Sequence, residues 1–283
     1  MPAIEKRKIS IAIPCYNSAN FIQDALRYPI LDERVDDIVI SDDGSDDFEE
    51  LSRKVGELNA PKIKIHRNTV NSGGCYKNKA IAASYAKNDW LILLDSDNFF
   101  DKNFIDALYS IHKWEENTFY CPANGMILPH FNFEDFDRRI DFDIFKEHLK
   151  GRKVSTTPRL KFLYTVFFNS PKFLQKLISY AFMMNKSNRF LSLMNDSNYF
   201  VNKESFLINH ELSKKEKLNP FSADTIFSNF IWLRQNNYMQ VVQQMTYFHT
   251  VHSESYWVKT MESYSHVLKW IIDQMDISST PKK

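Results

Sequence analysis

The stretch Leu91-Ile92-Leu93-Leu94-Asp95-Ser96-Asp97-Asn98 joins a short apolar run to two carboxylates one residue apart. Apolar runs of this length are typical of strands that are buried on both faces of a parallel sheet. Alternate residues beyond the strand can point to the same side, so Asp95 and Asp97 can converge on one hard cation, which prefers carboxylate oxygens. An acidic turn that only contacts solvent or caps a helix is the alternative interpretation.

Polar blocks follow other predicted strands of the first hundred residues as well. Apolar or alternating runs predict strands at residues 9–13, 37–40, 62–66 and 90–94. Helices are predicted between them, with Ser18 as the cap of the first, and another over residues 102–114. This alternation predicts a mainly parallel sheet with helices on both faces, in which ligands bind at the carboxyl ends of the strands. We therefore expect the polar blocks to meet in one crevice.

Composition restricts the class of protein. The 283 residues suffice for one large α/β domain, and a formal net charge of +1 gives no indication of a nucleic-acid partner. Cys15, Cys75 and Cys121 lie far apart without metal-ligand spacing, which predicts reduced thiols. No apolar run approaches the ~20 residues that span a bilayer, and no signal-peptide pattern is present. We expect a cytoplasmic protein, at most peripheral at the membrane.

Four ordered blocks within residues 8–105 carry a family resemblance. They are Pro14-Cys15-Tyr16-Asn17, Asp42-Asp43-Gly44-Ser45, Asn71-Ser72-Gly73-Gly74 with Asn78, and Asp95-Ser96-Asp97. In this order the blocks resemble glycosyltransferase family 2. The resemblance implies an α/β GT-A (Rossmann-like) fold, with a mainly parallel central sheet flanked by helices and a helical acceptor-side insertion. It also implies an inverting transfer of a sugar from a nucleotide-sugar donor to a hydroxyl acceptor, in polysaccharide or glycoconjugate biosynthesis.

The resemblance places the first two blocks around the nucleoside of the donor. Pro14, Tyr16 and Asn17 would line the pocket for the base and ribose, and Tyr16 could stack on the base for ~1–3 kcal/mol. A strand-end aromatic without a ligand role is the alternative for Tyr16. Asp42 would accept a hydrogen bond from the imide N–H of the base, which favours uracil or thymine over cytosine. Family frequency then favours a UDP-sugar.

The third block and the helix after it offer contacts to the rest of the donor. Asn78 matches the Asn that the family usually has at that place, and we expect it to bind the donor. Lys77 and Lys79 could approach the diphosphate, but a solvated helix face explains either lysine equally well. Asp43 has a weaker claim to the donor, because capping the following helix is an equal alternative.

The resemblance makes Asp97 the first ligand of a Mn²⁺ or Mg²⁺ ion that bridges the diphosphate oxygens. Asp95 would be a second ligand through water, or a contact to the ribose or sugar of the donor. Such a cation neutralises charge on the leaving group. Asn98 stands where family members often have a third acid, and it could still ligate through its carbonyl oxygen.

Inversion requires a base that takes the proton of the acceptor hydroxyl, and Asp224 is the predicted base. It opens a predicted amphipathic helix, as the Glu-Asp block of the family does, with Ala223 in place of the Glu. An Asp with its ordinary pKa of ~3.9 is a poor base unless burial or a neighbour raises that value. A helix N-cap or first-turn acid is the alternative role.

Further polar residues follow the later strands, which are predicted at residues 195–201 and 240–247. A His after the last strand is a metal or phosphate ligand in some GT-A enzymes, and His252 is favoured slightly over His249. A simple hydrogen-bonding His is the alternative. Asp196 is a reserve candidate for a contact to the acceptor sugar. Residues 261–275 have helical periodicity.

We expect one domain over residues 1–283, with a nucleotide-sugar-binding half (1–123) and an acceptor-side half (124–283). Residues 160–184 are rich in Leu, Phe and Tyr, with interleaved lysines, and Pro171 predicts two helices there. This region could be an acceptor-site wall, a surface for a homo-oligomer, or a basic patch on membrane lipids. Helices that pack on the core with solvated lysines are the fourth alternative. The acceptor would be a glycan or a lipid-linked molecule.

Two other functions are alternatives to sugar transfer. A non-catalytic nucleotide-sugar-binding or scaffold protein could retain the donor pocket, and Asn98 and Ala223 are the departures that keep this alternative open. A nucleotidyltransferase is disfavoured because no Gly-rich activation loop follows Ile13.

Overall fold

Strands and helices alternate through the first half of the chain, as the sequence predicts. The computed structural model describes residues 7–125, 131–152, 167, 170–216, 224–250 and 264–278. The first four strands are β1 (Ile9–Cys15), β2 (Val35–Asp42), β3 (Ile63–Arg67) and β4 (Trp90–Leu93). The helices that connect or follow them are α1 (Ile22–Arg27), α2 (Phe48–Glu57), α3 (Cys75–Tyr85) and α4 (Lys102–Tyr109).

Four further strands and six further helices complete the described elements. The strands are β5 (Phe99–Phe100), β6 (Thr118–Asn124), β7 (Phe200–Asn202) and β8 (Tyr238–Phe248). The helices are α5 (Phe142–Leu149), α7 (Lys172–Met183), α8 (Lys186–Asn195), α9 (Lys203–Lys214), α10 (Asp224–Arg234) and α12 (Tyr264–Ser278).

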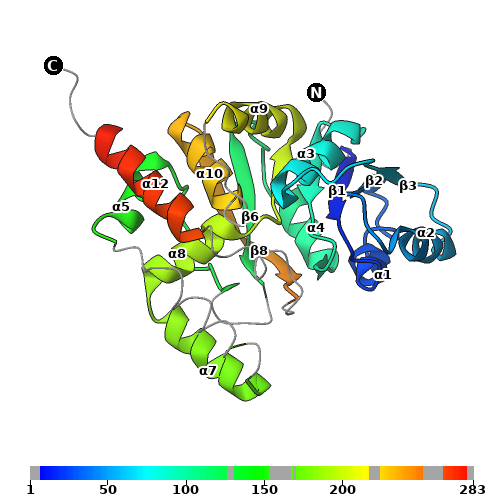
Figure 1. The fold of residues 1–283 in the computed structure, drawn as a ribbon, viewed down its shortest axis with the longest axis horizontal. Coiled ribbons are helices and arrows are strands. Elements are labelled where there is room, and N and C mark those ends of the chain that lie inside the picture. Colours follow the sequence, from blue (N-terminus) through cyan, green and yellow to red (C-terminus); the bar gives the residue numbers. More distant parts are fainter. Residues whose placement is uncertain are drawn as a thin grey trace.

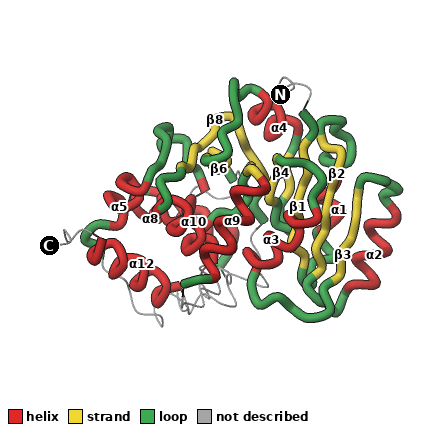
Figure 2. The backbone as a smooth tube through the Cα atoms, turned by 90° about the horizontal axis from the view of Figure 1, so that it is seen from above, coloured by secondary structure: helices red, strands yellow, loops and turns green. Residues whose placement is uncertain are grey.

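The described strands form one sheet in the order β3-β2-β1-β4-β7-β6-β8-β5. Strands β3, β2, β1 and β4 are parallel to one another, and β6 is parallel to β8. Strand β7 runs antiparallel to both β4 and β6, and β5 runs antiparallel to β8. Figures 1 and 2 show helices on both sides of this sheet, with α5, α8 and α12 at the end far from β3. The structure confirms the α/β fold with a mainly parallel, helix-flanked sheet.

Alternation along the strands divides the core into two layers. Leu91 and Leu93 of β4 face a cluster with α3, α9 and α10, whereas Ile92 and Leu94 face α1, α2 and α4. All four side chains are fully buried. A strand buried on both faces reads as a continuous apolar run, which is why residues 91–94 were recognisable in the sequence.

Several boundaries differ from the prediction because local hydrogen bonds compete with helix and strand. Ser18 does not cap α1, since its hydroxyl donates to the carbonyl oxygen of Tyr16 and the helix begins at Ile22. The helix predicted over 102–114 ends at Tyr109. The strand predicted from residue 195 begins at Phe200, because Asn195 ends α8 and its next residues fold into a loop.

Helix α10 is not amphipathic, contrary to the prediction. Each residue from Thr225 to Leu233 is buried, because α10 packs between α8, α9 and α12. A helix enclosed by other helices needs no polar face, and its few polar residues bond inside the core. Asn229, for example, donates to the carbonyl oxygen of Met194 and to the hydroxyl of Tyr199, both at 2.9 Å.

The acceptor-side helical region lies in part outside the described residues. Helix α7 follows Pro171, as predicted, whereas the first of the two expected helices lies mostly outside the described residues. The two halves of the domain were expected to meet between residues 123 and 124. Both residues belong to β6, which lies between β7 and β8 in the sheet. Among the described residues, no helix is long and apolar enough to cross a membrane.

Candidate active site

Three of the four polar blocks lie together at the carboxyl ends of β1, β2 and β4. Hydrogen bonds join the block after β1 to the block after β2. Strand β1 lies between the other two strands in the sheet. The backbone N–H of Asn17 donates to the hydroxyl of Ser45 at 2.9 Å, and the Asn17 side-chain oxygen accepts from the N–H of Asp46 at 2.9 Å. Pro14 is buried in β1, whereas Tyr16 at the rim is 51% exposed. Tyr16 therefore presents a ring that a ligand can reach.

Asp42 ends β2 with one carboxylate oxygen left without a partner. The side chain is fully buried, and its Oδ2 accepts from the N–H of Ser45 at 3.2 Å and lies 3.6 Å from Nε of Arg67. Its Oδ1 is buried and has no hydrogen-bond partner. An unsatisfied buried acceptor is costly, so this oxygen suits a donor group supplied by a ligand.

Asp43 and Asn78 hydrogen-bond to the loops and strand ends at this edge of the sheet. Asp43 accepts from the Asn68 side chain and from both the N–H and hydroxyl of Ser72, at 2.8–2.9 Å. It does not cap the next helix, whose N-cap is Asp47. Asn78 is 2% exposed, donates to the Ser41 carbonyl oxygen at 2.8 Å and accepts from the Ser41 hydroxyl at 2.6 Å. Both polar atoms of Asn78 are thus used within the protein, and its predicted contact to the donor stays a prediction.

Lys79, for which the sequence left both a diphosphate contact and a solvated helix face open, is not solvated. Its side chain is fully buried on α3, and Nζ lies 2.7 Å from Oδ1 of Asp95. Nζ also donates to the carbonyl oxygen of Ser197 at 2.9 Å and to the hydroxyl of that residue. Burial alone would lower the pKa of Lys79, but the Asp95 carboxylate reverses this effect and raises it. Lys77, by contrast, is exposed.

The Asp95–Asp97 turn follows β4, as predicted. Burial pushes the pKa of Asp95 upward, but the Lys79 ammonium outweighs it and keeps that pKa below its ordinary value. Asp97 is half-buried. Asn98 is buried, and its Oδ1 accepts from the N–H of Thr250 at 2.9 Å, so this oxygen is not presented to a cation. Of the predicted acidic pair, Asp95 is paired with Lys79, and the role of Asp97 as a metal ligand stays a prediction.

Asp224 starts α10 and reaches the first turn of α3. Its Oδ2 accepts from the backbone N–H of Tyr76 at 2.9 Å, and a Cβ on Gly74 would lie 3.4 Å from the same oxygen. Burial, with a smaller contribution from Asp95, raises the pKa of Asp224 to about 6. The Tyr76 N–H and Lys79 oppose this rise. The structure therefore supplies the burial that an Asp base requires.

The later predicted residues have internal partners or fall outside the described residues. Asp196 is buried and accepts from the hydroxyl of Tyr247 at 2.7 Å and from the N–H of Asn198 at 3.0 Å. His249 lies beside them, with Nδ1 3.0 Å from the Tyr247 hydroxyl, and its charge would lower the pKa of Asp95. His252 lies outside the described residues, so its role as a metal ligand stays a prediction.

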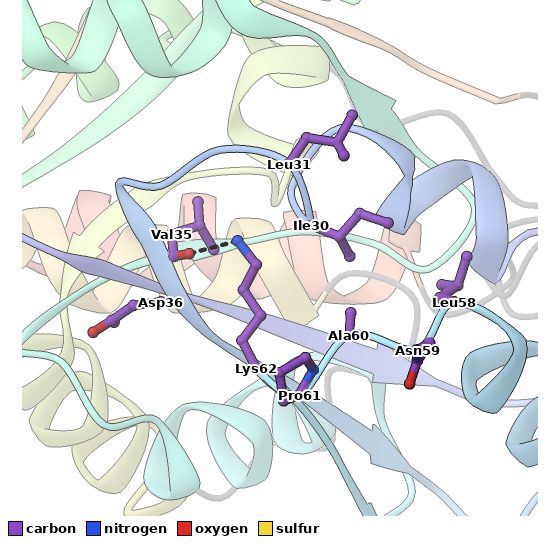
Figure 3. Close-up of a pocket in the computed structure, with 9 residues that line it drawn as sticks. All are labelled: Ile30, Leu31, Val35, Asp36, Leu58, Asn59, Ala60, Pro61 and Lys62. Atoms are coloured by element: carbon purple, nitrogen blue, oxygen red, sulfur yellow. Dashed lines mark hydrogen bonds between the residues drawn. The ribbon is translucent and has the colours of Figure 1, made fainter.

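A pocket at the opposite end of the sheet is separate from this site. It is lined by residues 30–31, 35–36 and 58–62, at the amino ends of β2 and β3 (Figure 3). Lys62 reaches across it and donates to the Val35 carbonyl oxygen at 2.7 Å. Ligands of parallel sheets bind at the carboxyl ends of strands, so we do not assign the donor to this pocket.

Comparison with known proteins places the chain in a family. The model of Glycosyl transferase family 2 matches residues 10–181, more than half of the chain, and the chain belongs to this family. It is 28% identical over 178 residues to the uncharacterized glycosyltransferase MG060 of Mycoplasma genitalium. That match covers 58% of this chain and 58% of the relative, so the chain spans little more than half of that protein.

Two solved structures share the fold at low identity. TarS 1-349 of S. aureus in complex with UDP-GlcNAc has a TM-score of 0.56 and 16% identity, over 98% of this chain and 68% of that one. GalNAc-T7 with UDP, GalNAc and Mn²⁺ has a TM-score of 0.55 and 14% identity, over 95% of this chain and 50% of that one. At these identities the likeness shows the GT-A fold alone.

The raised pKa of Asp224 predicts a pH-dependent cost in stability. Between the unfolded pKa of 3.8 and the folded pKa of about 6, the native state holds a proton that the unfolded state has lost. Stability therefore falls as pH rises through this window. Asp224→Asn keeps an acceptor for the Tyr76 N–H without the charge, so we expect a higher melting temperature than wild type at pH 7.5.

The advantage of Asp224→Asn should shrink as the pH is lowered from 6 toward 4, where wild type also carries no charge at this position. Differential scanning calorimetry over this range measures it, with the exposed Asp143→Asn as the matched control. An Asn variant that melts below wild type at every pH would contradict the raised pKa.

Proposed function

We propose that this chain transfers a sugar from a UDP-sugar to a hydroxyl acceptor with inversion, and that Asp224 is the general base. Membership of the family and the clustering of its motif residues at one sheet edge support nucleotide-sugar chemistry. The observation that carries the proposal is the half-buried carboxylate of Asp224 near Lys79 and Asp95, with a pKa of about 6. A base with this pKa is ionised at neutral pH and can still accept a proton usefully.

The donor is proposed to bind across the ends of β1 and β2. The exposed ring of Tyr16 would cover the base, and the unpartnered Oδ1 of Asp42 would accept the imide N–H of uracil. Thymine carries the same N–H, whereas cytosine does not. UDP-GlcNAc in the TarS structure is consistent with a UDP donor, although that ligand is a property of TarS.

The leaving group is proposed to depart with the help of a divalent cation, Mn²⁺ or Mg²⁺, near Asp97. When bound, such a cation offsets the charge that develops on the departing diphosphate. Asp97 is the described carboxylate that would hold it, and His252 is the further ligand expected from the sequence. Asp224 would accept the proton of the acceptor hydroxyl as that oxygen attacks the anomeric carbon from the opposite face.

The proposed role of Asp42 predicts selectivity among nucleotides. Wild type should bind UDP more tightly than CDP, because only uracil donates an imide N–H to Oδ1. Asp42→Asn presents an amide where both Ser45 and the base need an acceptor, so UDP affinity should fall about tenfold, the size of one charge-assisted hydrogen bond. CDP affinity should change little. Titration calorimetry with the exposed Asp46→Asn as control measures this, and equal losses for both nucleotides would refute the role of Asp42.

The proposed role of Asp224 predicts a loss of turnover without a loss of donor binding. Asp224→Asn should lower kcat about 10²- to 10⁴-fold, the contribution of a positioned base, while UDP affinity stays within a factor of two or three of wild type. Wild-type kcat should decline as pH falls below about 6. Release of UDP from a panel of UDP-sugars with sugar acceptors measures both. Donor binding by wild type with no turnover on any acceptor would favour the non-catalytic scaffold.

Helix α7 supports the proposal that the protein meets its acceptor at a membrane surface. Phe173, Leu177, Tyr180 and Met184 follow one line of α7 and its last turn, and they are 54–85% exposed. Their spacing of four, three and four residues places them on one helix face. The exposed Lys172 and Lys176 flank this face, and no acidic residue occurs in α7. This combination suits an anionic lipid surface, as a lipid-linked acceptor would require.

Flotation with vesicles tests this membrane contact. Wild type should bind phosphatidylglycerol-containing vesicles and bind pure phosphatidylcholine only weakly, and Phe173→Glu with Leu177→Glu should abolish binding. Ile208→Glu, on an exposed apolar residue of α9, is the matched control. No binding by wild type would refute the proposal. If light scattering shows a dimer and the double substitution makes it dissociate, this face is a homo-oligomer surface instead.

A further inference from the structure

Lys79 is a fully buried ammonium whose charge needs a fixed partner. Its Nζ lies 2.7 Å from Oδ1 of Asp95 and donates to both the carbonyl oxygen and the hydroxyl of Ser197. These three oxygens match the three donors of an ammonium group. A buried charge is tolerated only when it is paired and hydrogen-bonded, and Lys79 meets both conditions inside the protein.

The Asp95 carboxylate is saturated by protein groups as well. Its Oδ1 faces Lys79 and the Cys75 thiol at 3.8 Å. Its Oδ2 accepts from the Ser197 hydroxyl at 3.1 Å, from Asn198 Nδ2 at 3.2 Å and from Asn98 Nδ2 at 3.4 Å. A carboxylate offers about four acceptor positions in total, and these contacts use them. A cation that took Asp95 as a ligand would have to displace these bonds and stand close to a buried ammonium.

We infer that Lys79, and not a divalent cation, is the counter-charge of Asp95, so that Asp95 is a positioning residue. Of the Asp-x-Asp pair, Asp97 alone then supplies a carboxylate to the cation and the donor. The role of Asp97 rests on the proposed function, whereas the ion pair stands on the contacts alone.

The ion pair joins three segments that are distant in the sequence. Lys79 comes from α3, Asp95 from the turn after β4, and Ser197 from the segment that leads into β7. Asn198 strengthens the junction, because its Oδ1 accepts from the N–H of Asp95 at 2.9 Å. The pair therefore fixes the turn that carries Asp97 against the acceptor-side half of the protein.

A double-mutant cycle tests the ion pair without any ligand. Lys79→Met and Asp95→Asn should each lower the urea midpoint of unfolding markedly. Asp95→Asn leaves the fully buried Lys79 ammonium unpaired, and Lys79→Met leaves the half-buried Asp95 carboxylate without its counter-charge. Combining them removes both charges, so the double variant should unfold at a higher urea concentration than either single variant. Additive losses would refute the ion pair. If Lys79→Met is insoluble, Lys79→Gln with Asp95→Asn completes the cycle.

Binding of Mn²⁺ in the presence of UDP, followed by the electron paramagnetic resonance of free Mn²⁺, tests the division of roles. Asp95→Asn should weaken Mn²⁺ binding at least threefold, because the unpaired Lys79 repels the cation. The double variant Lys79→Met with Asp95→Asn should return to within threefold of wild type, whereas Asp97→Asn should lose at least tenfold. If Asp95 were a ligand, the double variant would stay as weak as Asp97→Asn. Absence of Mn²⁺ binding by wild type with UDP would overturn the assignment of Asp97 and the cation in the proposed function, and the urea cycle would still decide the ion pair.

Discussion

The buried ion pair between Lys79 and Asp95 is the constraint on which the arrangement of the site depends. An ammonium without solvent must keep its partner within hydrogen-bond distance, so the depth of α3 against β4 is fixed at this point. The neighbouring Asn78 bonds to the end of β2 from the same helix. Two consecutive residues of α3 therefore tie it to both the end of β2 and the turn that carries Asp95.

The same helix sets the chemistry of Asp224. The Asp224 carboxylate lies at the start of α3, where the N–H of Tyr76 donates to it. Burial raises the pKa of Asp224, whereas Lys79 opposes that rise and Asp95 adds to it. Of these two opposed influences the Lys79 ammonium has the larger, so the ion pair as a whole moderates the rise in the pKa of Asp224. The result is an acid that is ionised at neutral pH yet basic enough to accept a proton.

The sequence predicted the first four strands and the edge at which the polar blocks meet, because those features follow from local periodicity and from the geometry of parallel sheets. It did not predict the place of Lys79. A lysine in a helix is solvated by default, and its burial depends on Asp95 and Ser197, which lie far away in the chain. The enclosure of α10 was missed for a similar reason. Its burial is set by the helices that pack around it, among them α5, α8, α9 and α12, and no pattern within residues 224–234 predicts them.

The departure at Asn98 is explained by the ion pair. An amide at this position donates through Nδ2 to Asp95 and accepts through Oδ1 from the backbone of Thr250. An ionised carboxylate could not donate, and it would place further negative charge against an Asp95 that a single ammonium already neutralises. Asn98 therefore completes the hydrogen bonding of Asp95 and joins its turn to the segment after β8. Its presence is compatible with a working site, and it no longer favours the non-catalytic scaffold over a transferase.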